Sequence, residues 1–548
     1  MKKRNFKLKT VFIFLFSFVA IAATKQDIYR KIKDSQRTIN NVYKFLITHY
    51  VDDIDLEKFT KMSIDNMLSD LDPYTVYLVD DQKSGLDMLT SGQYGGVGIQ
   101  IGKRDNVITV IAPTDDSPAK RAGIMAGDVL IKIDGEDTES MSMDDAAKLI
   151  RGKKGSSVVL TIERFNEEEP IDFTLTREDI PVKDVSYFGM LDESIGYIRL
   201  TRFSKNSADE VEKAIVSLKS NDLSSIVLDL RDNPGGLLNS AVSILDMFFE
   251  KDELLVWTDG KARQSSKKYY SKSNPIVSDD IQIAVLINGG SASASEIVAG
   301  VMQDLDRGVV VGRQSFGKGF VQTVYNIDRN KALKVTTAKY YIPSGRLIQK
   351  SGYLPEEILA DTTEADSLFE TIGGRIVKGG KGITPDYVVE SDDRMPILLA
   401  SLRKGLFFSY VQKNKHNYNS FEEVLNDPIL LSQVEDFIMS FGDDLNIKLD
   451  GENNYLDTRE TLMNLDSNNI SITGAIELLD SYFEEKAITQ FDREQEDIKQ
   501  WMLMEFAKHF DGEQGRMSIS KKIDEDIVKA ISILELSLIH ISEPTRPY

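Results

Sequence analysis

The spacing of apolar residues changes along the chain and divides it into segments. Residues 25–90 carry apolar positions at helical spacing. In residues 91–177, glycines separate short alternating runs, which predict a module of strands with one helix at 143–150. After residue 392 the pattern is helical again and rich in Asp, Glu and Asn.

Strand and helix patterns alternate between residues 194 and 389. The predicted strands cover residues 195–200, 226–230, 281–287, 309–311, 320–327 and 333–341. The predicted helices cover residues 207–218, 237–249 and 295–305. Repeated strand-helix units of this kind predict an α/β domain.

The first residues have the pattern of an export signal. Five Lys or Arg residues lie within residues 1–9, and an apolar run of thirteen residues follows at 11–23 and ends in small residues. This predicts a secretory signal peptide over 1–22 and a periplasmic or cell-envelope protein. Because the run is shorter than the roughly 20 residues of a spanning helix, an uncleaved anchor is the less favoured alternative.

Composition excludes several classes of chemistry. Lys and Arg total 66 against 87 Asp and Glu, a formal net charge of −21, which argues against nucleic acid as the main partner. The absence of cysteine removes disulfides, thiolate catalysis and cysteine-zinc sites. None of the four histidines lies between residues 179 and 392, so a nucleophile in the α/β domain has no imidazole from that domain to activate it.

The segment NGGSASASE at residues 288–296 joins a predicted buried strand to a predicted helix. A helix N-terminus offers free N–H groups and the positive end of the helix dipole, so Ser293 is a candidate nucleophile beside an anion site. Ser293 and Glu296 also have the spacing of a helix capping box. From this motif alone, Ser293 could be either a nucleophile or only a structural helix cap.

Without His or Cys, the base for a serine nucleophile must be Lys, Asp or Glu. Lys318 stands between two glycines, and burial would have to lower its pKa by roughly 3 units before it could act as a base. A solvated loop lysine is the alternative. The run 312–319 is close to a phosphate-binding loop, but it has Gly319 where that loop needs Ser or Thr, and a strand pattern follows, so no nucleotide site is expected.

The run DLRDNPGG at residues 229–236 follows another predicted strand. Its two glycines leave N–H groups free at the start of a helix, which suits an oxyanion hole. An ordinary turn has the same composition.

These motifs, with LDPY at 71–74 and GITPD at 382–386, resemble the C-terminal processing peptidases, the tail-specific Ser-Lys serine proteases of peptidase family S41. The resemblance implies a multidomain α/β (α+β) fold: a crotonase- or ClpP-like protease core, an inserted PDZ domain, and helical N- and C-terminal regions.

The same resemblance implies roles for individual residues. Ser293 would be the nucleophile, Lys318 the base and Gln322 the residue that orients the lysine, while the backbone N–H groups of Ala294 and Gly236 would bind the oxyanion. A flat strand would hold Lys318 and Gln322 about 13 Å apart. Their contact therefore needs a bend in the chain.

The module at 91–178 resembles a PDZ domain, in which loop N–H groups capture a terminal carboxylate. By this resemblance the loop residues are Gly96, Val97, Gly98 and Ile99. The expected partners are protein or peptide substrates with apolar C-termini. Neither nucleic acid, nucleotide, metal nor cofactor is expected.

The sequence therefore predicts six segments. They are a signal peptide at 1–22, a helical segment at 23–90, a PDZ domain at 91–178, a protease core at 179–391, a helical region at 392–536, and a non-native tail at 537–548 that resembles a translated sequencing adapter. The predicted activity is that of an exported serine endopeptidase, and the helical regions are candidate surfaces for a homo-oligomer. The alternative function is a non-catalytic, peptide-binding PDZ scaffold on a protease-like fold.

Overall fold

The computed structural model describes most of the chain. The described residues are 27–104, 107–164, 167–350, 367–390, 395–445, 452–466 and 470–542. The chain divides into two compact units, Met1–Leu71 and Asp72–Tyr548. The predicted signal peptide and the last six residues of the predicted tail lie outside the described residues.

The described part of the first unit, residues 27–71, is mainly helical, as predicted. Residues 27–49 form one helix, and α2 (Leu56–Leu68) follows with Asp55 as its N-cap. The Tyr43 and Thr60 hydroxyls are 2.9 Å apart and join the two helices. No helix in the described parts of the chain is long and apolar enough to cross a membrane.

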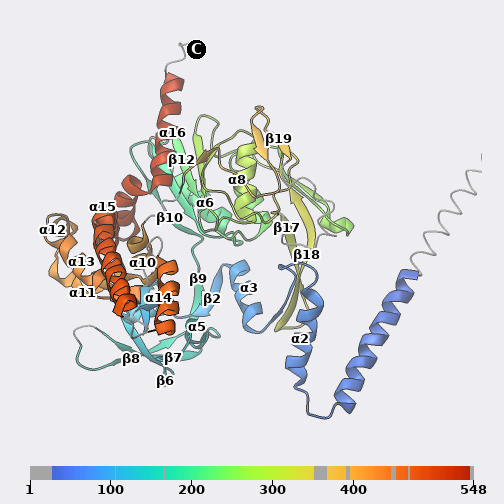
Figure 1. The fold of residues 1–548 in the computed structure, drawn as a ribbon. Coiled ribbons are helices and arrows are strands. Elements are labelled where there is room, and N and C mark those ends of the chain that lie inside the picture. The colour runs from blue at the N-terminus through green and yellow to red at the C-terminus, as the bar shows by residue number, and fades with distance from the viewer. Residues whose placement is uncertain are drawn as a thin grey trace, which may run out of the picture. The chain divides into compact units, whose positions relative to one another are not determined.

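A six-stranded sheet forms the centre of the second unit (Figure 1). Its order is β10 (Val185–Met190), β11 (Ile195–Leu200), β12 (Ser225–Asp229), β15 (Gln282–Ile287), β16 (Val309–Gly312) and β21 (Tyr387–Val388). All neighbours are parallel except β10 and β11. The helices α6 (Ser207–Leu218), α7 (Leu238–Leu245) and α8 (Ala294–Asp304) lie where the sequence predicts them, apart from small shifts at their ends.

Both faces of this sheet are buried. Ile226 and Leu228 of β12 belong to the core formed with α6, α7 and α8. Val227, between them, packs into a separate core with Ile527 and Leu534 of α16 (Glu525–Ser542). Because side chains alternate across a strand, this arrangement explains the continuous apolar runs of the central strands.

A second sheet contains β1 (Val76–Val79), β18 (Lys331–Tyr341), β13 (Leu254–Asp259) and β14 (Lys267–Tyr270), with β17 (Phe320–Asn326) also paired to β18. The expectation of helix throughout residues 25–90 is wrong at β1. Its Val, Tyr, Leu and Val residues pair antiparallel with β18, for example Val76 with Lys334. Such residues favour a strand when a partner edge is available. The helix α3 (Asp81–Ser91) then follows.

The predicted strand-rich module has its own apolar core. Its elements are β2 (Gln93–Gly96), β3 (Ile99–Arg104), β4 (Val107–Pro113), α4 (Pro118–Ala122), β5 (Val129–Ile133), β6 (Glu136–Asp137), α5 (Met143–Ile150), β7 (Ser157–Glu163), β8 (Ile171–Thr176) and β9 (Glu178–Pro181). The one predicted helix, at 143–150, is α5.

The described residues after 392 are mainly helical, as predicted. It contains α10 (Pro396–Lys404), α11 (Leu406–Asn414), α12 (Phe421–Leu425), α13 (Leu430–Met439), α14 (Glu452–Asp466), α15 (Ile470–Ile523) and α16. The φ and ψ angles of Asp511 and Gly512 break α15 into two parts. Before this region, β19 (Leu368–Glu370) and β20 (Ile376–Lys378) form a hairpin.

Candidate active site

Ser293 lies at the start of α8, in the position expected of a nucleophile. It is the N-cap residue, with φ +55° and ψ −110°, a backbone conformation that non-glycine residues rarely adopt and that costs about 1–3 kcal/mol. It is also the one residue between Ser291 and Asp304 that is not buried. The turn therefore holds a strained, accessible serine on an otherwise buried segment.

Glu296 joins the serine segment, residues 288–296, to the loop that carries Lys318, residues 313–319, which is called the lysine loop below. Its carboxylate is completely buried, and one oxygen, Oε2, accepts hydrogen bonds from the backbone N–H groups of Ser293 (2.7 Å) and Lys318 (2.9 Å). The other oxygen, Oε1, accepts from the Ser315 hydroxyl (2.5 Å) and the Gly317 N–H (2.7 Å). Glu296 is thus a helix cap, as the spacing suggested, and it also fixes the lysine loop beside Ser293.

Tyr340 of β18 makes the same connection from the other side. Its buried hydroxyl lies 2.7 Å from the Lys318 carbonyl oxygen and 3.2 Å from the Ser293 carbonyl oxygen, so it can donate to either. The backbones of Ser293 and Lys318 therefore share one carboxylate and one phenol. Among the hydrogen bonds of the described residues there is none from Ser293 Oγ to Lys318 Nζ, and catalytic contacts of this kind often tighten only when substrate binds.

The side chain of Lys318 lies in surroundings that favour its neutral form. Burial lowers its pKa to about 8, and the nearby cation of Lys334 acts in the same direction, against the smaller opposing effects of Glu296 and Asp72. The Lys318 ammonium also lies 4.8 Å from the ring centroid of Tyr74. A pKa near 8 leaves about a tenth of the lysine neutral at pH 7, enough for a general base.

The turn with Gly236 packs directly against the serine segment. The Asn233 carbonyl oxygen accepts hydrogen bonds from the Ala292 N–H (3.0 Å) and the Ser295 hydroxyl (2.9 Å). Gly236 has φ +151°, and a Cβ there would overlap the carbonyl oxygen of Phe203. The N–H groups of Gly236 and Ala294 donate to no other residue in the part of the chain that the structure describes. Both are free to bind an oxyanion.

Gln322 lies on β17, four residues after Lys318. Its Nε2 donates to the Phe320 carbonyl oxygen at 3.3 Å, and among the described residues no hydrogen bond joins it to Lys318. The pairing of β17 with β18 shifts register between Val321 and Gln322, so the strand is bent here. The contact of Gln322 with Lys318 and its orienting role stay predictions.

The predicted carboxylate loop connects β2 to β3. The carbonyl oxygens of Val97 and Gly98 accept N–H groups from Ala119 (3.0 Å) and Thr114 (2.8 Å). Gly98 has φ +76°, and a Cβ there would overlap the Ser117 side chain. The N–H groups of Val97 and Gly98 have no acceptor among the described residues, so they are available to a carboxylate. Gly96 ends β2 and Ile99 begins β3.

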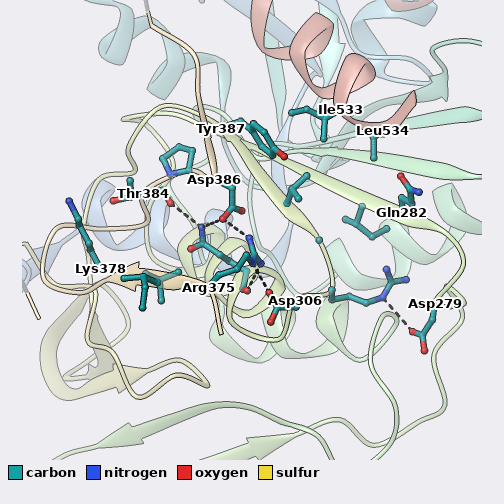
Figure 2. Close-up of a pocket in the computed structure, with 18 residues that line it drawn as sticks. Asp279, Gln282, Asp306, Arg375, Lys378, Thr384, Asp386, Tyr387, Ile533 and Leu534 are labelled. Atoms are coloured by element: carbon teal, nitrogen blue, oxygen red, sulfur yellow. Dashed lines mark hydrogen bonds and ion pairs between the residues drawn. The ribbon is translucent and has the colours of Figure 1, made fainter. Parts of the chain in front are cut away.

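A pocket of about 740 Å³ lies elsewhere, among residues that follow α8 and residues of β16, β20 and α16 (Figure 2). None of the candidate catalytic residues lines it. Its charged groups pair with each other: Arg375 contacts Asp306 and Asp386, each at 2.6 Å. The described residues also contain no group of three or more His, Asp or Glu side chains that could hold a metal ion.

Comparison with known proteins places the chain in a family. Residues 194–359 match the model of peptidase family S41, and residues 109–164 match that of the PDZ domain. The chain is 40% identical over 323 residues to the carboxy-terminal-processing protease of Bartonella bacilliformis, an alignment that covers 58% of this chain and 74% of that protein. The chain belongs to peptidase family S41. It is a serine-type peptidase with a PDZ domain, which confirms the family, the enzyme class and the fold class that the motifs indicated.

Among solved structures, the chain is similar to the photosystem II D1 C-terminal processing protease. It is 26% identical, with a TM-score of 0.36, and the alignment covers 65% of this chain and 88% of that one.

The structure adds neighbours of Lys318 to which the sequence gave no role. Tyr340, Lys334 and Tyr74 surround Lys318 but belong to β18 and to the LDPY segment, far from it in the chain. The Asp72 side chain accepts from the Thr336 hydroxyl at 3.0 Å and so ties the LDPY segment to β18. The LDPY motif was a usable signal, since it marks residues next to the lysine.

Proposed function

We propose that this S41 peptidase is an exported serine endopeptidase that captures protein C-termini through its PDZ domain and cleaves near them. One observation carries the catalytic part of the proposal. A strained, accessible Ser293 and a buried Lys318 with a pKa near 8 are tied to one carboxylate, in a domain that has neither His nor Cys.

The proposed mechanism uses neutral Lys318 as general base. It takes the proton of the Ser293 hydroxyl while Oγ attacks the scissile carbonyl carbon. The negative charge that develops on the carbonyl oxygen is bound by the N–H groups of Ala294 and Gly236. Protonated Lys318 then gives its proton to the leaving amine, and water, activated by the same lysine, hydrolyses the acyl-enzyme. Gln322 is proposed to orient the lysine.

The pKa of Lys318 predicts the pH dependence of cleavage. Below pH 8 the protonated amine cannot accept the serine proton, so kcat/KM should rise about tenfold per pH unit and level off above pH 8. Replacing Lys334 with Gln removes a neighbouring cation, raises the pKa of Lys318 and moves this inflection to higher pH. Kinetics across pH 6–10 measure both effects.

The matched control is Lys331→Gln on the same strand, which should leave the inflection in place. An inflection near pH 6.5, or the same inflection in wild type and Lys334→Gln, would contradict lysine as the base.

Recognition of C-termini predicts a dependence on the free carboxylate. Two peptides of identical sequence with an apolar last residue, one ending in a carboxylate and one in a carboxamide, should differ at least about tenfold in KM. The cause is loss of charge-assisted hydrogen bonds to the N–H groups of Val97 and Gly98. Equal KM values for the two peptides would show that the PDZ loop does not read the carboxylate.

The location and assembly of the protein are also part of the proposal. The basic and apolar pattern of residues 1–23 supports export to the periplasm or cell envelope. The helix at residues 27–49 exposes large apolar side chains, among them Ile32, Val42 and Phe45, which supports a homo-oligomer formed through the helical regions.

A further inference from the structure

The C-terminal helix α16 begins at a cluster of charges that includes Arg231, in the turn that carries Gly236. Asp524 caps the helix: its Oδ1 accepts the N–H groups of Asp526 (3.1 Å) and Ile527 (3.2 Å). The same oxygen accepts from Arg231 Nη1 at 2.8 Å. The start of α16 is therefore joined to an arginine nearly 300 residues earlier in the chain.

Arg231 lies at the start of the turn that carries Gly236. Its Nε and Nη2 bind the buried carboxylate of Asp229 at 2.7–3.1 Å, and its Nη1 binds Asp526 Oδ2 at 2.9 Å as well as Asp524. The Arg231 side chain is only 10% exposed. An arginine bound on two sides cannot change rotamer without breaking charged hydrogen bonds, so it fixes the beginning of the turn.

Asp526 also binds a second arginine, at the start of the lysine loop. Arg313 follows β16, and its Nη1 contacts Asp526 Oδ2 at 3.1 Å. Two residues later, Ser315 donates to Glu296, the carboxylate that also holds Lys318. One oxygen of a single buried aspartate thus connects the turn with Gly236 to the loop with Lys318.

Apolar packing holds α16 in this position. Ile527, Ala530 and Leu534 are buried against the second face of the six-stranded sheet, together with Met517 of α15. The Lys521 ammonium donates to the Leu191 carbonyl oxygen. The packing of α16 against the core therefore sets the positions of Asp524 and Asp526.

We propose that Asp524 and Asp526 are positioning residues for catalysis. By fixing Arg231 and Arg313, they hold the turn with Gly236 and the lysine loop in place relative to each other. This inference rests on the proposed roles of Gly236 and Lys318. Neither aspartate touches substrate. Because a misplacement of about 1 Å can cost on the order of 100-fold in rate, the loss of their charge should act on kcat.

The test uses the full chain with Asp526→Asn, Asp524→Asn and the double variant, assayed on a quenched peptide substrate well below the unfolding temperature. We expect kcat to fall at least about tenfold in Asp526→Asn and further in the double variant, with KM within about twofold. A peptidyl boronate, which mimics the tetrahedral intermediate, should lose affinity by the same factor. Asp526→Glu should restore most of kcat.

Glu525→Gln is the matched control, since it makes the same charge change in the same turn on an exposed residue. A purely structural role would lower the unfolding temperature and leave kcat of the folded protein unchanged, and that result would overturn the inference. If Asp526→Asn does not fold, Arg313→Gln, on a partly exposed side chain, tests the same connection and should also lower kcat.

Ser293→Ala is assayed in parallel to separate the two levels of the proposal. If Ser293→Ala is inactive and the double aspartate variant has wild-type kcat, only the role of α16 fails. If Ser293→Ala stays active, the proposed catalytic site itself fails.

Discussion

Replacing Ser293 with Ala should lower kcat by at least about 10⁴-fold, because no other group can form the acyl-enzyme. The oxyanion N–H groups of Ala294 and Gly236 stay in place, so only a small residual rate is expected. The Ser293 side chain contributes to the fold through the capping box with Glu296, and loss of a cap costs about 1 kcal/mol, so the unfolding temperature should stay within a few degrees of wild type. Cleavage of an unfolded substrate with an apolar C-terminus, with circular dichroism of the same samples, measures both quantities.

Ser217→Ala on the exposed face of α6 is the control for this variant and should keep full activity. Substantial cleavage by Ser293→Ala would mean that the nucleophile lies elsewhere. Peptide binding without cleavage by the wild-type protein would instead agree with the scaffold alternative.

Substitution of Lys318 should cause the second large loss of kcat. Lys318→Met should lower kcat at least about 10³-fold, because both the base and the acid of the proposed mechanism are lost. Lys318→Arg should be equally inactive, since a guanidinium stays protonated at all working pH values and cannot accept the serine proton. Folding should be retained, because removing a partly buried cation also removes its desolvation cost. Steady-state kinetics and thermal unfolding of the two variants test this.

Lys331→Met, on β18, is the matched control and should keep wild-type kcat. Near-normal activity of Lys318→Arg would contradict a role that requires the neutral amine, and would leave the lysine as a binding residue only.

The α/β core could be predicted closely from the sequence. The strands β11 and β15 and the helix α6 are long apolar or amphipathic segments with clear ends, so local spacing is enough to locate them. The candidates for the nucleophile and the base could be limited from the sequence. The domain contains neither His nor Cys, which excludes an imidazole base and a thiolate nucleophile from it.

Other features depend on contacts between distant residues, which leave no local pattern. β1 is a strand because β18 offers it an edge, and its four residues alone cannot show that. The joining role of Glu296 needs the lysine loop to fold back onto α8, 22 residues away in the chain. The pairing of Asp526 with Arg231 spans 295 residues. An acidic helical tail without a motif therefore gave no sign that it contacts the catalytic domain.

The most direct test of the central claim is labelling with a fluorophosphonate, followed by mass spectrometry of the modified peptide. Fluorophosphonates react with a serine only when a base activates it and an oxyanion site binds the product. We predict one adduct, on Ser293, formed at a rate that rises with pH through about 8 and lost in Lys318→Met. An adduct on another residue, or an actively cleaving protein with no adduct on Ser293, would contradict the account.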